Sequence, residues 1–314
     1  MTKPTVVVAL GGNALLCRGE PLEADVQRIN VCCAAKAIAK MTQDWNVVLV
    51  HGNGPQVGLL ALQNSAFKEV KPYPLDILVA ETQGMIGYML QQELQNILPG
   101  TPVVTMLTQV EVDSKDPAFL MPTKYIGPVY DKAEADQLAL DKGWEFKNDG
   151  KYIRRVVPSP KPLNIVESDS IRQLIDQGNL VICSGGGGIP VTRQDEKLIG
   201  VEAVIDKDLS AAFLAKQINA DALLILTDAD AVYLNWGTEQ QEALRITHPE
   251  TLAEMEFDAG SMGPKITAAC EFVNATKGQV GIGCLTDGAD ILKGECGTLI
   301  MDKSQTQSIY KLKM

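Results

Sequence analysis

Three glycine-rich segments in this 314-residue chain could bind an anion through their backbone N–H groups. Each follows a short run of apolar residues, many of them β-branched, which is typical of a strand buried on both faces of a parallel sheet. The carboxyl ends of parallel strands meet at one edge of a sheet, so we expect the segments to converge into one phosphate-sized site. They are Gly11-Gly12-Asn13 after Val6–Leu10, His51-Gly52-Asn53-Gly54 after Val47–Val50, and Ser184 to Gly188 after Leu180–Cys183.

Simpler interpretations stay open for single members of this set. Gly11-Gly12 alone would equally suit a tight strand-to-helix turn that binds no ligand, because glycine permits sharp turns anywhere. His51 stands at a strand end without a neighbouring nucleophile or acid motif, so we expect it to be a structural hydrogen-bonding residue. Because a glycine-rich segment follows a buried strand three times, the pattern favours an anion-binding site.

Several other kinds of site are excluded by the motifs that the chain lacks. It has no G-x-x-x-x-G-K-[ST] phosphate loop, no G-x-G-x-x-G after a strand, and no G-x-S-x-G nucleophile turn. Its two histidines and seven cysteines form no Cys-x-x-Cys pair and no His/Cys cluster, which argues against zinc and against a disulfide framework.

Composition and charge narrow the class of protein. The chain is 46% hydrophobic and 21% charged, as in ordinary globular enzymes, and its formal net charge of −11 argues against nucleic-acid or anionic-membrane partners. No apolar run approaches the ~18 residues of a membrane span, and the first residues lead directly into a strand. We therefore expect a cytoplasmic protein, 1–314 forming one domain, in which a few lysines supply a local positive field for the anion.

Strand-like and helix-like segments alternate along most of the chain, which predicts an α/β fold. The helix expected over Leu75–Ile97 contains Gly84 and Gly87, which suggests close packing on a neighbouring helix or a second subunit, although a core helix also fits. Asp208 or its neighbour is expected to cap a helix that runs to Ile218. Further helices are expected over 21–40, 56–67, 169–177 and from about 260, and strands over 102–112, 222–226, 279–285 and 298–301.

The stretch 114–162 differs from this alternation because it carries prolines, charges and scattered aromatic residues but no long periodic run. We expect an inserted excursion from the main sheet, which we call the flap. Lys124 lies in its turn Pro122–Pro128, where an ordinary solvated lysine would also fit.

The order and spacing of seven motifs resemble those of carbamate kinases, members of the amino-acid kinase family. The resemblance covers the chain from Val6 to about Ile300. The motifs are Ala9 to Leu15, His51 to Gly58, Gln83 to Tyr88, Arg154 to Pro160, Gly185 to Val191, Val204 to Asp208 and Gly260 to Lys265.

This resemblance implies a three-layer α/β/α sandwich with a mainly parallel central sheet, a small protruding subdomain over 114–162, and a homodimer. It also implies the reversible reaction of ATP with carbamate to give ADP and carbamoyl phosphate, with Mg²⁺ accompanying the nucleotide. In the family the reaction usually runs toward ATP, in the catabolism of arginine or related nitrogen compounds.

The resemblance also assigns roles to residues. Lys207 and Lys265 would contact phosphate, Asp208 would orient them, and Lys124 would reach over the site from the flap. Carbamate and the transferred phosphoryl group would be held by Gly11, Gly12, Asn13, Gly52, Asn53, Gly54, Gly186 and Gly187. The nucleotide would be bound by Thr227, Asp228, Ala229, Tyr233 and Met262, and no protein metal site is expected.

One sequence feature favours carbamate as the substrate, and two others depart from the pattern of carbamate kinases. Relatives acting on acetylglutamate, uridylate or aspartate carry a lysine where this chain has Ala9, so Lys207 would supply the missing charge, which favours carbamate. Tyr125 stands where many carbamate kinases have proline, and the segment around Ala229 also differs. Two alternatives remain: a related kinase for another small carboxylate, and a catalytically silent nucleotide-binding paralogue.

Overall fold

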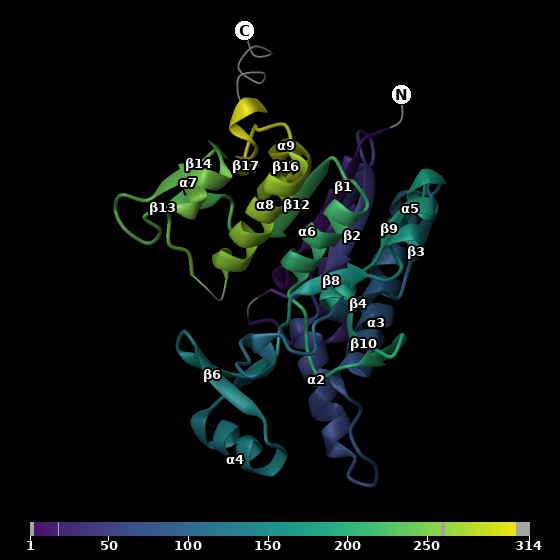
Figure 1. Cartoon of the computed structure of the whole chain (residues 1–314), viewed down its shortest axis with the longest axis vertical. Coiled ribbons are helices and arrows are strands. Elements are labelled where there is room, and N and C mark those ends of the chain that lie inside the picture. Colours follow the sequence, from purple (N-terminus) through teal and green to yellow (C-terminus); the bar gives the residue numbers. More distant parts are fainter. Residues whose placement is uncertain (1–2, 18, 259–260, 306–314) are drawn as a thin grey trace.

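An eight-stranded, mainly parallel sheet forms the centre of the molecule (Figure 1). The computed structural model describes residues 3–17, 19–258 and 261–305. All neighbouring strands of this sheet run parallel except β16 and β17. In spatial order the strands are β15 (Ile246–Thr247), β17 (Thr298–Ile300), β16 (Gln279–Cys284), β12 (Ala222–Thr227), β1 (Thr5–Leu10), β2 (Asn46–His51), β9 (Leu180–Ile182) and β3 (Val103–Thr105).

Alternate residues of the central strands enter two separate hydrophobic cores, one on each face of the sheet. Val7 and Ala9 of β1 belong to one core, whereas Val6 and Val8 belong to the other. Side chains of a strand alternate between faces, so an all-apolar strand requires a helical layer on both sides. The first core is covered by α5 (Ser168–Asp176), α6 (Lys207–Gln217), α7 (Pro249–Ala253) and α8 (Met262–Thr276), and the second by α1 (Ala24–Met41), α3 (Leu75–Ile97) and α9 (Gly288–Ile291).

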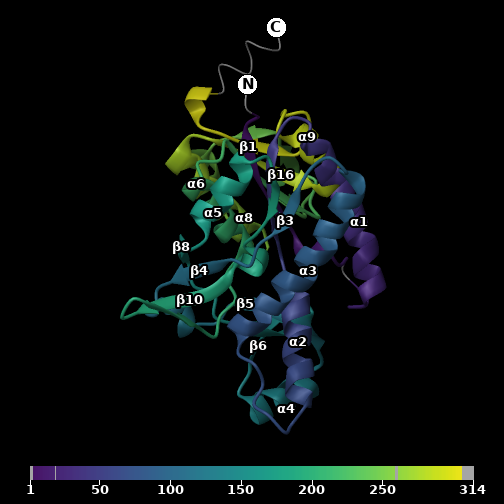
Figure 2. The same ribbon diagram turned by 90° about the vertical axis from the view of Figure 1, so that its right-hand side faces the viewer.

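The two helical layers lie on opposite sides of the strands when the molecule is turned by 90° (Figure 2). The predicted three-layer α/β/α sandwich with a mainly parallel central sheet is therefore confirmed. None of the helices in the described part of the chain has the length and apolar character needed to cross a bilayer.

The segment predicted as one strand over 102–112 forms two strands in two different sheets. Its first part is β3 of the central sheet, whereas its second part joins a separate four-stranded sheet. The prediction of a single strand was wrong because the chain changes sheets between Thr105 and Gln109, and the residue types of a strand do not show which sheet it joins. The second sheet consists of β11 (Lys197–Gly200), β10 (Ile189–Gln194), β4 (Gln109–Val112) and β8 (Pro162–Ile165).

The flap contains its own antiparallel sheet, β5 (Lys124–Tyr130), β7 (Tyr152–Val157) and β6 (Glu145–Asp149), and lies apart from the central strands in Figure 1. It also contains α4 (Lys132–Lys142), which the missing periodicity did not predict. Only Ala135 of this helix is buried, so it needs no apolar stripe. Its ends are fixed instead by the Asp131 side chain, which accepts a hydrogen bond from the Glu134 N–H, and by Gly143 in the left-handed conformation.

Gly87 of α3 packs closely on Thr105, whereas Gly84 faces open space, so the two glycines of this helix have different environments.

The remaining elements lie between the strands and helices described above. These elements are α2 (Gly54–Ala66), the hairpin of β13 (Val232–Leu234) and β14 (Glu242–Leu244), and, in the described part of the chain, four short 3₁₀ turns, η1 (Gly12–Ala14), η2 (Pro117–Phe119), η3 (Gly185–Gly187) and η4 (Leu285–Asp287).

Candidate active site

The three glycine-rich segments converge on a cavity of about 1110 Å³ at the carboxyl edge of the central strands. Their convergence was predicted and is confirmed, because β1, β2 and β9 are parallel neighbours in one sheet. Residues from all three segments line the cavity: Gly11, Gly12, Gly52, Asn53, Gly54 and Gly186.

The segments approach one another closely. A Cβ atom at Gly52 would lie in van der Waals contact with the Gly12 nitrogen, at 3.4 Å, whereas one at Gly186 would not fit, because it would lie 2.1 Å from Nδ2 of Asn53. Gly186 also has φ +67°, which favours glycine. The glycines therefore let the three backbones share one small volume.

Two of the glycine-loop predictions stay open. Gly187 is not among the residues that line the cavity, because it packs against the backbone of Ile205, where an added Cβ would lie 2.3 Å from the carbonyl oxygen. Asn13 lies in η1, but its side chain is outside the described part of the structure.

Three helices begin at this cavity, and helix N-termini favour negative charge. Residues from the start of α2, α6 and α8 line it. The N-cap residues Asn53 of α2 and Ser261 of α8 make no capping hydrogen bond with their side chains. Asn53 instead donates from Nδ2 to the Thr82 hydroxyl at 2.9 Å. Backbone N–H groups at the start of α2 and α8 can therefore serve an anionic ligand, whereas those of Asp208 and Leu209 in α6 already donate to Asp206. Gly260, at the start of the last motif, lies outside the described residues.

Lys207 and Lys265 meet on the two oxygens of one buried carboxylate. Lys207 Nζ donates to Oδ1 of Asp208 at 2.5 Å, and Lys265 Nζ donates to Oδ2 at 3.0 Å. Lys207 and Asp208 lie in the first turn of α6 and Lys265 in the first turn of α8, and the two helices pack against each other. Asp208 is 2% exposed and Lys207 is 7% exposed.

The charges of this cluster are set by burial and by the neighbouring groups. Burial by itself would raise the pKa of Asp208, but the two ammonium groups outweigh it and the pKa is lowered, so the carboxylate stays ionised. Burial lowers the pKa of Lys207, and Lys265 adds repulsion. The pKa of Lys265 is raised, because Asp208 outweighs the effect of burial. Two cations on one anion leave positive charge directed into the cavity.

Lys124 extends from the flap into the same cavity and binds a residue that the sequence did not single out. Its Nζ donates to Oδ2 of Asp206 at 2.5 Å. Asp206 is the N-cap of α6, which settles the open question of the cap, because its Oδ1 accepts from the backbone N–H of Asp208 and Leu209. The pattern Asp-Lys-Asp before an apolar run is an N-terminus signal that could have identified Asp206.

The predicted nucleotide residues Thr227, Asp228, Ala229, Tyr233 and Met262 all line the same cavity. Tyr233 donates from its hydroxyl to the Asp230 carboxylate at 2.9 Å, and its ring lies 5.1 Å from the exposed Trp236 ring, centroid to centroid. Trp236 and Arg154 also line the cavity but were not among the predicted site residues. Trp236 follows a short strand without any motif, so the sequence gave little signal for it.

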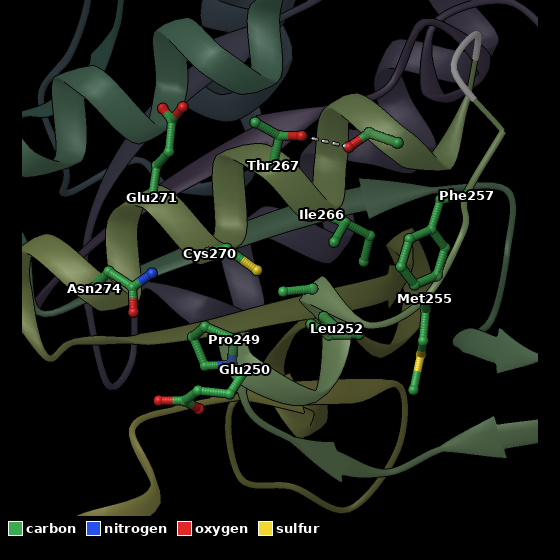
Figure 3. Close-up of a pocket in the computed structure, with 12 residues that line it drawn as sticks. Pro249, Glu250, Leu252, Met255, Phe257, Ile266, Thr267, Cys270, Glu271 and Asn274 are labelled. Carbon is green, nitrogen blue, oxygen red and sulfur yellow. Dashed lines mark hydrogen bonds between the residues drawn. The ribbon is translucent and has the colours of Figure 1, made fainter.

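A second cavity of about 600 Å³ lies between α7 and α8 (Figure 3). Its lining is mostly apolar and includes Leu252, Phe257, Ile266 and Cys270, and burial raises the pKa of the Cys270 thiol to about 11. Figure 3 shows the Glu271 carboxylate directed away from these apolar side chains. None of the described residues that line this cavity is a lysine or belongs to the glycine loops, so the larger cavity is the candidate active site.

The comparisons with known proteins agree with this geometry. Residues 4–283 match the model of the amino acid kinase family. The carbamate kinases of Rhizobium meliloti (strain 1021) and Escherichia coli (strain K12) are 57% and 56% identical over 299 and 296 residues; the alignments cover 94% of this chain and 92% and 99% of those proteins. The structure of the carbamate kinase from Giardia lamblia bound to AMP-PNP superposes with a TM-score of 0.87 at 44% identity, covering 96% of this chain and 99% of that one. This chain therefore belongs to the amino acid kinase family and, within it, to the carbamate kinases.

Proposed function

We propose that this protein catalyses the reversible transfer of a phosphoryl group between ATP and carbamate, giving ADP and carbamoyl phosphate. The observation that carries the proposal is the pair of ammonium groups on buried Asp208, beside the three converging glycine loops. Similarity to the carbamate kinases named above supports the same reaction.

This arrangement suits a phosphoryl acceptor that is already an anion. Carbamate needs no general base, and the only histidine beside the glycine loops, His51, is buried with its pKa lowered to about 4. Phosphoryl transfer depends mainly on alignment of the reactants and on neutralisation of charge on the transferred oxygens. We assign alignment to the backbone of the glycine loops and neutralisation to Lys207, Lys265 and Lys124.

We place the nucleotide against Thr227–Tyr233 and Met262, with its phosphates toward Lys265. AMP-PNP bound to the Giardia relative supports a nucleotide in this cavity. Among the described residues no group of three His, Cys, Asp or Glu side chains could hold a metal ion. Mg²⁺ often keeps waters and binds mainly to substrate phosphates, so we propose that it enters with the nucleotide.

The proposal is tested by measuring ATP formation from carbamoyl phosphate and MgADP. We expect turnover with carbamoyl phosphate to exceed that with acetyl phosphate by at least ~10²-fold, since the acceptor site must distinguish an amino from a methyl group. Preference for acetyl phosphate would favour the alternative of another carboxylate substrate. Nucleotide binding without turnover of either donor would favour the silent paralogue, which the retention of both lysines and Asp208 argues against.

We also propose that the protein is a homodimer. The outward face of α3 carries the exposed apolar residues Ile77, Met85 and Tyr88 at helical spacing, and open Gly84 lies between them. Such an exposed apolar stripe is typical of an interaction surface. Light scattering on Gly84→Glu should show a monomer where the unmodified protein is a dimer.

For the cellular setting we propose the cytoplasm and a catabolic direction. Six of the cysteines form no disulfide among the described residues (Cys32, Cys33, Cys183, Cys270, Cys284 and Cys296), which suits a reducing compartment. Carbamoyl phosphate is a mixed anhydride, so transfer of its phosphoryl group to ADP is the chemically favoured use, as in the breakdown of arginine or related nitrogen compounds.

A further inference from the structure

Asp206 joins the flap to the helix that carries the phosphate-binding cluster. One of its carboxylate oxygens, Oδ1, caps α6 by accepting from the backbone N–H of Asp208 and Leu209 at 2.9 and 3.2 Å. The other oxygen, Oδ2, accepts from Nζ of Lys124 at 2.5 Å. Both oxygens are thus committed, one to the first turn of α6 and one to the flap.

The two partners differ in how firmly they are held. The Asp206 side chain is 14% exposed and fixed by two backbone hydrogen bonds, whereas the Lys124 side chain is 27% exposed and lies on a flap strand. Its flexible stem makes no other polar contact through Nζ among the described residues. The helix therefore fixes the carboxylate, and the carboxylate fixes the lysine.

The local charges also support the conclusion that the Asp206 carboxylate fixes the lysine. Burial would raise the pKa of Asp206, but Lys124 and Lys207 outweigh it and the pKa is lowered well below its usual range. The carboxylate therefore remains ionised at neutral pH. A charge-assisted hydrogen bond of this kind is roughly twice as strong as a neutral one.

We propose that Asp206 is a positioning residue for the flap lysine: it holds the Lys124 ammonium at the cavity so that its remaining donors face the transferred phosphoryl group. An ammonium has three N–H donors, and Asp206 accepts from one of them. The other two N–H donors of Lys124 can therefore bind phosphoryl oxygens while the hydrogen bond to Asp206 is kept. The catalytic consequence rests on the proposed function, whereas the anchoring of the flap does not.

Asp206→Asn separates the two roles of the side chain. Asparagine is as good an N-cap as aspartate, so its one amide oxygen can keep the cap of α6. Its NH₂ group would then face the Lys124 ammonium, donor against donor, and the ion pair is lost. Asp206→Ser also caps without a charge and repeats the test with a smaller side chain. The matched control is Asp131→Asn, because Asp131 caps α4 in the same way on the exposed flap.

The experiment measures kcat and the KM for MgADP in a double-mutant cycle with Lys124→Met. We expect Asp206→Asn to lower kcat at least ~10-fold with KM changed less than ~2-fold, since a displaced group near the reacting atoms is costly. In the Lys124→Met background the same substitution should change kcat less than ~2-fold, because the lysine it positions is gone. Asp131→Asn should leave both constants within ~2-fold.

Either of two kinetic outcomes would overturn the inference. One is normal kcat in Asp206→Asn; the other is an equal loss of kcat with and without Lys124, which would mean that Asp206 acts through α6. Hydrogen exchange gives a readout independent of turnover: amides of Lys124–Tyr130 should exchange faster in Asp206→Asn than in Asp131→Asn, and equal rates would also contradict it. Absence of any turnover in the unmodified protein would instead contradict the proposed function.

Discussion

Single residues determine the local field of the site, against an overall charge of −11. Three lysines (Lys124, Lys207, Lys265) and two aspartates (Asp206, Asp208) form two linked ion-pair groups, so three positive and two negative charges leave an excess of one positive charge. Because these groups are largely shielded from water, their field is weakened less than that of surface charges. A phosphate group would therefore meet a positive centre in an acidic protein.

Lys265→Ala should lower kcat at least ~10²-fold, since that is the scale for losing one preorganised charge donor. Asp208 would keep Lys207 as its partner, so little stability should be lost. The measurement is ATP formation from carbamoyl phosphate at saturating MgADP. Lys216→Ala is the control, because Lys216 is exposed near the end of α6. Near-normal turnover in Lys265→Ala would remove this residue from the mechanism.

Lys207→Met should reduce kcat to a similar degree as Lys265→Ala. Ala9 is fully buried in β1 and offers no charge at the first glycine loop, whereas Cδ of Lys207 would be 3.4 Å from a Cβ on Gly52. Lys207 therefore stands beside the loops where the cation is needed. The steady-state assay should be accompanied by circular dichroism, with Lys216→Met as the matched variant. Substantial activity with an intact fold would mean that another group supplies the charge.

The sequence predicted some of these residues better than others. The glycine loops were predictable because strand type alone places their ends at one edge of a sheet. Asp206 was not singled out, since neighbouring Asp206 and Asp208 could each cap α6 and only the folded helix distinguishes them. Its pairing with Lys124 joins positions 82 residues apart, which no local pattern reveals.

At the scale of elements, the position of the flap depends on its contact with α2. Gly58 of α2 and Gly127 of β5 meet backbone to backbone, and a Cβ on Gly58 would lie 2.1 Å from the Gly127 nitrogen. Gly127 has φ +72° and lies three residues after Lys124. The glycine pair therefore lets the flap strand lie directly on the helix that begins at the second glycine loop.

Gly58→Ala should push the flap strand away from α2 and lower kcat at least ~10-fold, because small displacements of a positioned group have large effects on rate. The KM for MgADP should change less, since the nucleotide residues lie on other elements. The control is Gly100→Ala, at an exposed turn where an added Cβ would meet nothing within 4 Å. If Gly58→Ala kept its full kcat, the contact would not set the position of Lys124.

The sequence was less informative about elements that have little burial. Helix α4 was not predicted because it buries only Ala135, so the apolar periodicity that indicates a helix is missing and only its capping residues signal it. The two strands β3 and β4 were predicted as one, since strand propensity contains no information about which sheet a segment joins.

For the whole molecule, the order of elements was predictable because both faces of the central sheet are buried. Strands β1, β2 and β12 are apolar except at their ends, and a parallel sheet with helices on both faces is the arrangement that buries them. The antiparallel pairing of β17 with β16, and the pairing of β15 with β17 at the edge of the sheet, were not predictable, because such short strands depend on tertiary contacts.

The stability of the whole fold should depend on pH through His51. This side chain is 1% exposed, its Nδ1 lies 3.0 Å from the Gly52 carbonyl oxygen, and burial lowers its pKa from 6.5 to about 4. Between these values the unfolded chain binds a proton that the folded protein does not, so the free energy of unfolding falls as the pH decreases. From pH 7.5 to pH 5 this single group should remove about 2 kcal/mol, at 1.36 kcal/mol per pKa unit.

His51→Gln keeps a neutral hydrogen-bonding side chain at this position and removes the titration. Urea unfolding at pH 7.5, 6 and 5 gives the free energy of unfolding of each form. One protein concentration is used throughout, because the stability of the proposed dimer would depend on it. His51→Gln should be the less stable form at pH 7.5, since the replacement packs imperfectly, but it should lose about 2 kcal/mol less than the unmodified protein on going to pH 5. Taking the difference between the two forms cancels the carboxylates that titrate in both. Parallel pH profiles would mean that His51 can be protonated inside the folded protein, and that the buried neutral imidazole does not limit its stability in acid.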